Sequence, residues 1–196
     1  MIKKHIFIII TSLMFCGILN ASNKNYLSIG ESDAKITIKV FSSLTCPHCA
    51  NFHNKIYYNL KKEYIDRKKV KFEHHSFPLD LAALNAEKVL RCSNDNEKKF
   101  QLLGEIYRKQ NEWAIGSDIN IINEAIKNIG IQFGLNQKLI TKCIEDDKIQ
   151  DEILNGRIEA QKNYKISSTP TIFINKKKYE GKHEFKSFKK ALDKLL

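Results

Sequence analysis

The stretch Ser42-Ser43-Leu44-Thr45-Cys46-Pro47-His48-Cys49 marks the point where the sequence changes from a strand pattern to a helix pattern. Before it, residues 35–41 alternate polar and apolar side chains, which is the two-residue period of a β-strand. After it, a lysine-rich segment carries an apolar residue at every fourth position, which predicts an amphipathic helix. These apolar residues are Phe52, Ile56, Leu60 and Tyr64. Cys46 is therefore expected where a strand ends and a helix begins.

This junction gives Cys46 surroundings that favour a thiolate. Pro47 suits the first helical position, because proline has no N–H to lose and its φ angle is already helical. Free backbone N–H groups and the positive end of the helix dipole then face the Cys46 sulfur. Cys49 follows about one helical turn later, within reach of a disulfide with Cys46. The motif predicts a pair of thiols that cycles between a reduced and a disulfide form.

Two other interpretations of the motif are a purely structural disulfide and a metal site. A disulfide between residues i and i+3 closes a very small loop and adds little stability, which disfavours the first. Zinc would want a second pair of ligands at similar spacing, whereas Cys92 and Cys143 stand alone. Copper held by the thiolates and histidines is disfavoured as well, since His74 and His75 are neighbours in a predicted strand and point to opposite faces. No metal site is therefore predicted.

Residues 1–21 have the pattern of a secretory signal peptide, with two lysines followed by an apolar run over residues 6–19. As a helix this run would be about 21 Å long. A bilayer core is roughly 30 Å thick, so a spanning anchor is not expected. Cleavage is expected after Ala21, and a lipid-modified Cys16 is disfavoured because the bulky Phe15 precedes it. We expect the mature chain, residues 22–196, to be exported to a periplasm-like compartment.

The chain of 196 residues has a formal net charge of +11, and its lysines are spread over the predicted helix faces. It has no dense basic block with interleaved aromatic residues, so nucleic-acid binding is not predicted. A solvated surface accounts for the lysines. Attraction to an anionic membrane surface is the functional alternative.

The rest of the mature chain predicts one domain in which a sheet is interrupted by helices. Residues 70–77 read as a second strand, and residues 81–164 as a long helical stretch punctuated by four glycines, with Ser117-Asp118 as a plausible N-cap. A short β-branched run at 168–175, a hairpin partner at 178–181 and an amphipathic helix at 185–196 close the chain. The predicted fold class is an α/β sheet domain with an inserted all-helical sub-domain at about 81–164.

This pattern resembles the thioredoxin fold, and Pro-His between the two cysteines is similar to the DsbA family of thiol–disulfide oxidoreductases. Three further segments, at residues 30–34, 77–79 and 169–171, also look like that family, and the resemblance covers residues 26–196. The family carries a helical insertion at the place of residues 81–164. The resemblance therefore implies a thioredoxin-like domain of the DsbA type.

The resemblance implies a role for each residue of the motif. Cys46 would be the exposed nucleophile and Cys49 the buried partner that resolves the mixed disulfide. His48 would donate a hydrogen bond toward the Cys46 thiolate. A lowered thiol pKa stabilises the reduced form, which makes the disulfide a strong oxidant. Pro170 would be a cis-proline facing the active site, leaving the Thr169 backbone free to pair with an extended substrate; an ordinary trans proline that starts a strand is the alternative.

One position departs from the family. Many relatives carry a buried acid six residues before the first cysteine, and here that position is Val40, with Lys39 beside it. If the acid moves protons to the resolving thiol, this chain must use water or another group.

Cys92 and Cys143 bring the number of mature cysteines to an even count, which in an exported protein predicts a second disulfide. The bond would close a loop of about 52 residues and add on the order of 4 kcal/mol. Two buried free thiols, and a bond that tunes the active site, are the alternatives.

These observations predict an exported enzyme that donates disulfides to folding proteins with free cysteines. By resemblance, a membrane quinone-linked oxidase would reoxidise it, and no cofactor beyond the dithiol is implied. One alternative is a disulfide isomerase or reductase, although such enzymes usually carry an added dimerisation domain. The other is a copper- or metal-handling thiol protein.

Overall fold

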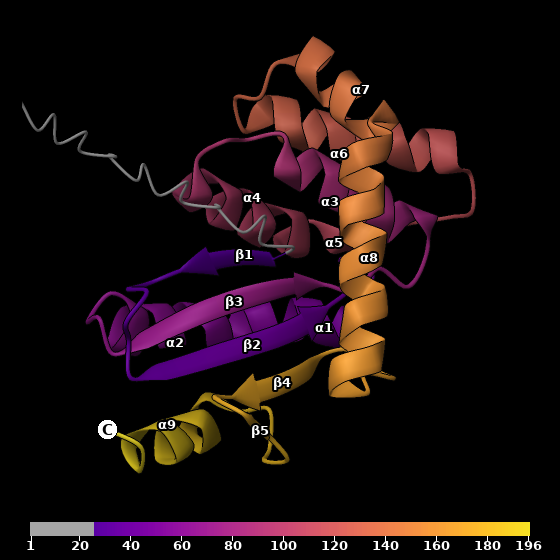
Figure 1. Cartoon of the computed structure of the whole chain (residues 1–196). Helices are drawn as coiled ribbons and strands as arrows, with labels where there is room; N and C mark the ends of the chain where they lie inside the picture. The colour runs from indigo at the N-terminus through magenta and orange to yellow at the C-terminus, as the bar shows by residue number, and fades with distance from the viewer. Residues whose placement is uncertain (1–25) are drawn as a thin grey trace, which may run out of the picture.

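The computed structural model describes residues 26–196, so the predicted signal peptide lies outside the described residues. These residues form a five-stranded sheet in the order β1-β3-β2-β4-β5, of which only β2 and β3 pair in parallel (Figure 1). The strands are β1 (Tyr26–Ile29), β2 (Ile36–Ser42), β3 (Val70–Ser76), β4 (Thr171–Ile174) and β5 (Lys177–Lys178). The sequence analysis missed β1, which is short and gains its ladder only by pairing antiparallel with β3.

The helix that follows the cysteine motif is continuous from Pro47 to Ile65 but alternates α and π geometry. It comprises α1 (Pro47–Phe52), the π segment η1 (His53–Tyr57), α2 (Tyr58–Leu60) and the π segment η2 (Lys61–Ile65). All four residues of the predicted apolar stripe are buried. The buried face is wider than the predicted stripe, because His53 and Tyr57 in η1 are buried as well.

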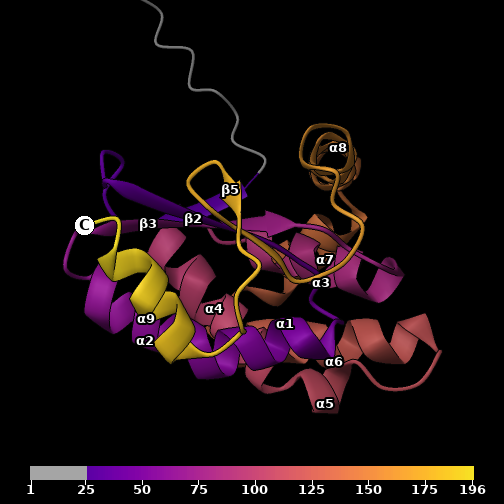
Figure 2. The same ribbon diagram turned by 90° about the horizontal axis from the view of Figure 1, so that it is seen from below.

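Helices cover the two faces of the sheet unequally. Figure 2 shows α1, α2 and the C-terminal helix α9 (Phe185–Asp193) together on one face, with α8 on the opposite face. The main core lies on the first face. A small cluster under α8 buries Phe41, Phe77, Ala160, Ile166 and Phe173 on the other.

The helical block between β3 and β4 occupies the predicted place. It consists of α3 (Leu81–Arg91), α4 (Asn96–Arg108), α5 (Gln110–Trp113), α6 (Ile119–Gln132), α7 (Gln137–Glu145) and α8 (Asp147–Tyr164). Asp118 caps α6 as expected, its side chain accepting from Asn120 N. An α/β sheet domain with an inserted all-helical block is therefore confirmed. Within residues 26–196, no helix is long and apolar enough to cross a membrane.

The four glycines predicted to punctuate the helical stretch fall into two groups. Gly116 and Gly134 lie outside helices and have positive φ angles, +80° and +90°. Gly104 and Gly130 instead lie inside α4 and α6. At Gly104 a Cβ atom would sit 2.5 Å from the Tyr58 hydroxyl, so the glycine lets the half-exposed Tyr58 side chain pack against α4.

Candidate active site

Cys46 lies at the predicted junction, in the loop between β2 and α1. It is the N-cap of α1, and Pro47 occupies the first turn. Its carbonyl accepts hydrogen bonds from the backbone of Cys49 and Ala50, both at 3.1 Å. Gln110 from α5, buried, donates its side-chain amide to the carbonyls of Leu44 (2.7 Å) and Cys46 (3.1 Å). The helix start and the inserted block thus hold the loop from two sides.

The Cys46 sulfur is surrounded by donors that stabilise a thiolate. The hydrogen bond from the Cys49 thiol is the main cause that lowers the pKa of Cys46 to about 5, against the opposing effect of burial. The Thr169 side chain and the backbone N–H groups of Cys49 and His48 lower the pKa further. Cys46 is buried, with 7% of the residue exposed, so the expectation of an exposed nucleophile is wrong: the Thr169 carbonyl packs against its sulfur.

Cys49 has the opposite character. It is 1% exposed, and burial is the main cause that raises the pKa of its thiol, followed by the hydrogen bond and charge of Cys46. Both sulfurs are free thiols in this structure. At neutral pH the pair therefore holds a thiolate at Cys46 and a thiol proton on the more deeply buried Cys49.

His48 and Pro47 are exposed beside the sulfurs. The backbone N–H of His48 is directed at Cys46, while its ring lies at the surface near His183, the residue two positions before α9. Burial, and after it the charge of His48, lowers the pKa of His183. Sequence reasoning did not single out His183, which reaches the motif only through the packing of α9.

Thr169 and Pro170 lie opposite Cys46, directly before β4. The peptide bond between them is cis. The Cys46 thiol donates to the Thr169 carbonyl oxygen at 3.4 Å, across a sequence separation of 123. The structure therefore brings together all six residues that the sequence analysis proposed for catalysis: Cys46, Pro47, His48, Cys49, Thr169 and Pro170.

Comparison with known proteins places this geometry in a family. The family model described as Thioredoxin matches residues 22–194. The chain belongs to this family. The chain is similar to the crystal structure of Wolbachia pipientis α-DsbA1, with 30% identity and a TM-score of 0.80 over 87% of this chain and 90% of that one. The predicted thioredoxin-like fold and the resemblance to DsbA proteins are both confirmed.

Relatives of this thioredoxin-family chain carry names that refer to disulfide chemistry. A Rickettsia bellii protein named as a protein-disulfide oxidoreductase is 29% identical over 174 residues, which are 89% of this chain and 66% of that protein. Disulfide bond formation protein D of Bacillus subtilis is 26% identical over 180 residues, 86% of this chain and 76% of that protein. The chain spans 60 to 66% of the length of the rickettsial relatives it matches.

Cys92 and Cys143 are joined in a disulfide in this thioredoxin-family structure. The bond connects the end of α3 to α7, with the two Cα atoms 5.9 Å apart and both residues buried. It lies in the helical insertion, away from the sheet. Within residues 26–196, no group of three or more histidine, cysteine or acidic residues is arranged to hold a metal ion.

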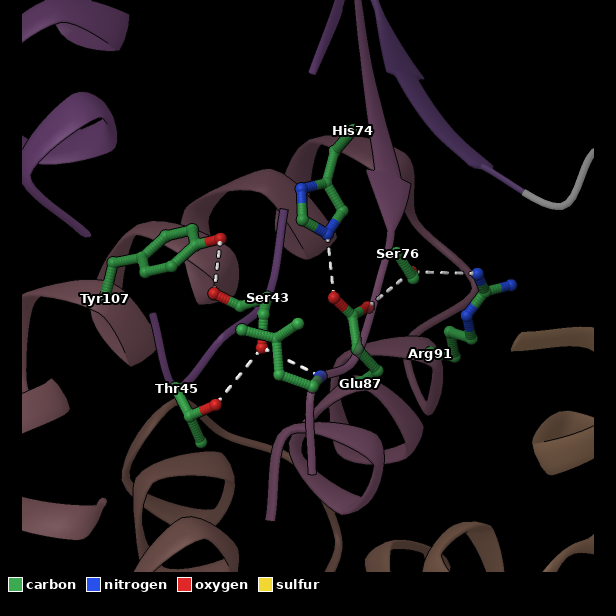
Figure 3. A network of polar contacts seen from close by, with 8 residues as sticks. Ser43, Thr45, His74, Ser76, Glu87, Arg91 and Tyr107 are labelled. Atoms are coloured by element: carbon green, nitrogen blue, oxygen red, sulfur yellow. Dashed lines mark hydrogen bonds and ion pairs between the residues drawn. The ribbon is translucent and has the colours of Figure 1, made fainter. Parts of the chain in front are cut away.

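A buried polar network behind the motif was missed by sequence reasoning. Figure 3 shows Tyr107 from α4 and the pair of His74 and Glu87, from β3 and α3, gathered near Ser43 at the end of β2. The Tyr107 hydroxyl donates to the Ser43 carbonyl at 3.5 Å, and His74 Nε2 lies 2.8 Å from Glu87 Oε1. Val40 is buried, and its partner across the parallel strands is His74. Nothing in the local sequence around Glu87 distinguishes it from an ordinary surface acid.

Proposed function

We propose that this protein is an exported thiol–disulfide oxidoreductase that introduces disulfide bonds into folding proteins through Cys46 and Cys49. The observation that carries the proposal is the opposite shift of the two thiol pKa values, with Cys46 lowered to about 5 and Cys49 raised. A thiolate that is stable in the reduced form makes the disulfide easy to give away. The family membership and the names of the relatives support the same chemistry.

The proposed reaction has two exchange steps. A client thiolate attacks the Cys46 sulfur of the disulfide form, the bond between the two cysteines breaks, and Cys49 leaves as a thiolate that takes up a proton. A second client thiolate then attacks the client sulfur of the mixed disulfide, and Cys46 leaves as its stable thiolate. The client gains a disulfide and the enzyme is left reduced. We assign the Thr169 backbone, whose carbonyl oxygen lies 3.4 Å from the Cys46 sulfur, to pairing with an extended client segment.

The cellular setting is part of the proposal. We assign residues 1–21 to a cleaved signal peptide, residues 22–196 to the mature domain, and the protein to the periplasm. Reoxidation is assigned to a membrane quinone-linked oxidase. The N-terminal residue of the protein recovered from an export-competent host tests the first point: Ser22 supports cleavage after Ala21, and Met1 opposes it.

The activity is tested with the oxidised protein and a reduced peptide that carries two cysteines. We expect this peptide to be oxidised in proportion to enzyme disulfide. With a matched peptide that carries a single cysteine, the Cys49→Ala variant, first activated as a mixed disulfide at Cys46, should retain the peptide at that residue. Cys46→Ala is the matched control and should capture no peptide. Peptide thiols that stay reduced with the wild-type protein, or peptide captured equally without Cys46, would refute the proposal.

A further inference from the structure

The positive charge of this chain is distributed unequally along the sequence. The helical block, residues 81–164, carries 12 lysines and arginines against 13 acidic residues, so it has almost no net charge. The last segment, residues 165–196, carries nine basic residues against three acidic ones. More than half of the net charge of +11 therefore lies in a segment that contains β4, β5 and α9.

The β4–β5 hairpin lies at the end of the sheet that is farthest from Cys46. The Asn175 N–H donates to the Thr37 carbonyl at 2.7 Å, and the Thr37 N–H donates to the Asn175 side chain at 2.8 Å, so the hairpin turn lies beside the start of β2. Cys46 follows the other end of β2, which ends at Ser42. The five residues of strand between Thr37 and Ser42 cover about 17 Å. Figure 1 shows the end of α9 at the hairpin end of the sheet, away from the start of α1.

The turn before β3 brings more basic residues to the same end. Val70 pairs with Ile36 in parallel register, so residues 67–69, which are all basic and exposed, lie beside the start of β2. Lys68 forms an ion pair with Glu31 at 3.2 Å. Among the described residues 26–196, the other two form no ion pair. Two segments that are far apart in sequence thus meet in one basic surface.

A pocket of about 840 Å³ opens at this end, between the β4–β5 hairpin and the last turn of α9. Its lining is apolar on one part and lysine on another: Ile174, Tyr179, Ala191 and Leu195, then Lys176, Lys177, Lys178 and Lys194. The one acid of the lining, Glu180, pairs with Lys178 at 3.0 Å. The other three lysines form no ion pair within the part of the chain that the structure describes. Such a pocket fits an anionic amphiphile, with its negative headgroup on the lysines and its hydrocarbon inside.

Protection of the sheet edge explains only some of these lysines. β5 is the last strand of the sheet, and lysines on an edge strand discourage pairing with another sheet. This role accounts for Lys177 and Lys178, which form β5. It does not account for Lys194, which lies across the pocket on the α9 side, or for Leu195 beside it, which is 42% exposed. Basic residues with apolar neighbours are the combination that binds anionic lipid surfaces.

We propose that this basic end, residues 67–69, 176–178 and Lys194, docks on a membrane surface that contains anionic phospholipid, with one lipid seated in the pocket. The lysines contact lipid phosphates, and Leu195 with the apolar lining contacts hydrocarbon. In this orientation Cys46 faces away from the bilayer, toward clients in solution. A membrane oxidase would meet Cys46 only after the protein leaves this orientation. That division of the cycle rests on the proposed function, whereas the docking itself does not.

Sedimentation with vesicles tests the docking, using the protein recovered after export. We expect binding to vesicles that contain phosphatidylglycerol, little binding to phosphatidylcholine alone, and a loss of binding as salt rises. Each lysine near an anionic surface changes the partition coefficient about fivefold, so Lys176→Gln combined with Lys194→Gln should lower it about 25-fold. The matched control is Lys142→Gln combined with Lys148→Gln, which makes the same charge change at exposed positions of the helical block. This control should stay within about twofold of wild type.

Tryptophan fluorescence tests the orientation. Trp113 is the single tryptophan of the chain and lies in α5, whose Gln110 contacts the Cys46 carbonyl at 3.1 Å. Brominated lipids quench only tryptophans that they approach closely. Trp113 should therefore keep its emission when the wild-type protein binds vesicles. Leu195→Trp places a reporter in the pocket lining, and its added emission should be quenched.

Each outcome supports or overturns the inference. Equal losses in the two lysine pairs would overturn it, because net charge alone would then drive binding. Equal binding to charged and neutral vesicles, quenching of Trp113 in the wild type, or an unquenched Leu195→Trp reporter on bound protein would overturn it as well. Circular dichroism should match wild type in the lysine variants, since the replaced side chains are exposed. Vesicle binding without peptide oxidation would refute the proposed function and leave the docking in place.

Discussion

Lowering the pH should destabilise the folded, reduced form of the protein, with a midpoint at about pH 5. The cause is Cys46, whose pKa falls from the ordinary 9.0 to about 5 in the folded chain. The Cys49 hydrogen bond is the main contributor to this fall. The disulfide form has no such thiolate. The effect of pH on the two forms must therefore differ by the energy of this one ionisation.

The magnitude follows from proton counting. Between about pH 5 and pH 9 the folded reduced chain has lost the Cys46 proton, whereas the unfolded chain still holds it. Unfolding takes up one proton in this window, so the stability of the reduced form rises with pH by about 1.4 kcal/mol per unit. This stability is lost as the pH falls toward 5, and the loss between pH 7 and pH 5 is about 2 kcal/mol. Cys49 stays protonated in both states throughout this window, because its folded pKa is raised.

The assay is the redox equilibrium with glutathione at a series of pH values. Because a free thiol has an ordinary pKa of about 8.5, glutathione stays protonated over most of the window. The equilibrium constant for reducing the protein should therefore rise about tenfold per pH unit above about pH 5 and level off below it. Going from pH 7 to pH 5 should lower it about fiftyfold, because the curve levels off at the Cys46 midpoint.

An equilibrium constant that stays flat through neutral pH would refute the reasoning, because it would mean that Cys46 keeps its proton. A titration of thiolate absorbance gives an independent reading. Cys49→Ala should raise the Cys46 midpoint, since it removes the largest cause of the lowered pKa. Asn51→Ala, an exposed change in the same helix, should leave the midpoint in place.

Two further predictions concern stability. Replacing both Cys92 and Cys143 by alanine should lower the free energy of unfolding by about 4 kcal/mol, because the disulfide spans a sequence separation of 51. Denaturant unfolding without reductant measures this free energy, and a value equal to that of the wild type would contradict the prediction. Gly30→Ala should cost on the order of 1–3 kcal/mol for its φ of +95°, and more because the new Cβ would lie 2.5 Å from the Val70 carbonyl oxygen. Gly116→Ala is the control, because Gly116 has a φ of +80° and an added Cβ there would have nothing within 4 Å. Thermal unfolding of the two variants side by side isolates the effect of the Val70 contact, and equal losses of stability would contradict the prediction.

The predictable part of the fold is the part encoded by local periodicity. The strand before Cys46 and the helix after it follow from alternation and from the four-residue stripe, and both elements appear within a residue or two of the expected limits. The placement of Cys46 as the helix cap with Pro47 in the first turn follows from the same pattern. Strand β1 has only four residues and no partner nearby in sequence, so local patterning could not reveal it.

The buried network behind the motif depends on contacts between distant segments. Tyr107 and Ser43 are 64 residues apart, and neither has a sequence context that indicates their hydrogen bond. How α3 and α4 pack on the sheet decides that Tyr107 meets Ser43 and that Glu87 meets His74. Local periodicity carries no information on such packing, so these contacts could not be predicted from the sequence.

The meeting of Cys46 with Thr169 shows how the sheet converts two separate motifs into one site. Strands β2 and β4 pair antiparallel, with Phe41 opposite Thr171, so the segment before β4 lies beside the segment after β2. That register sets the 3.4 Å distance between the Cys46 sulfur and the Thr169 carbonyl oxygen. A slip by one residue would move the carbonyl by about 3.3 Å and turn the strand's side chains to the other face. All four residues of β4 are buried, with Ile172 and Ile174 in the main core and Phe173 in the cluster under α8. A slip would exchange these side chains between two closely packed cores, so the packing holds the register that sets the geometry at Cys46.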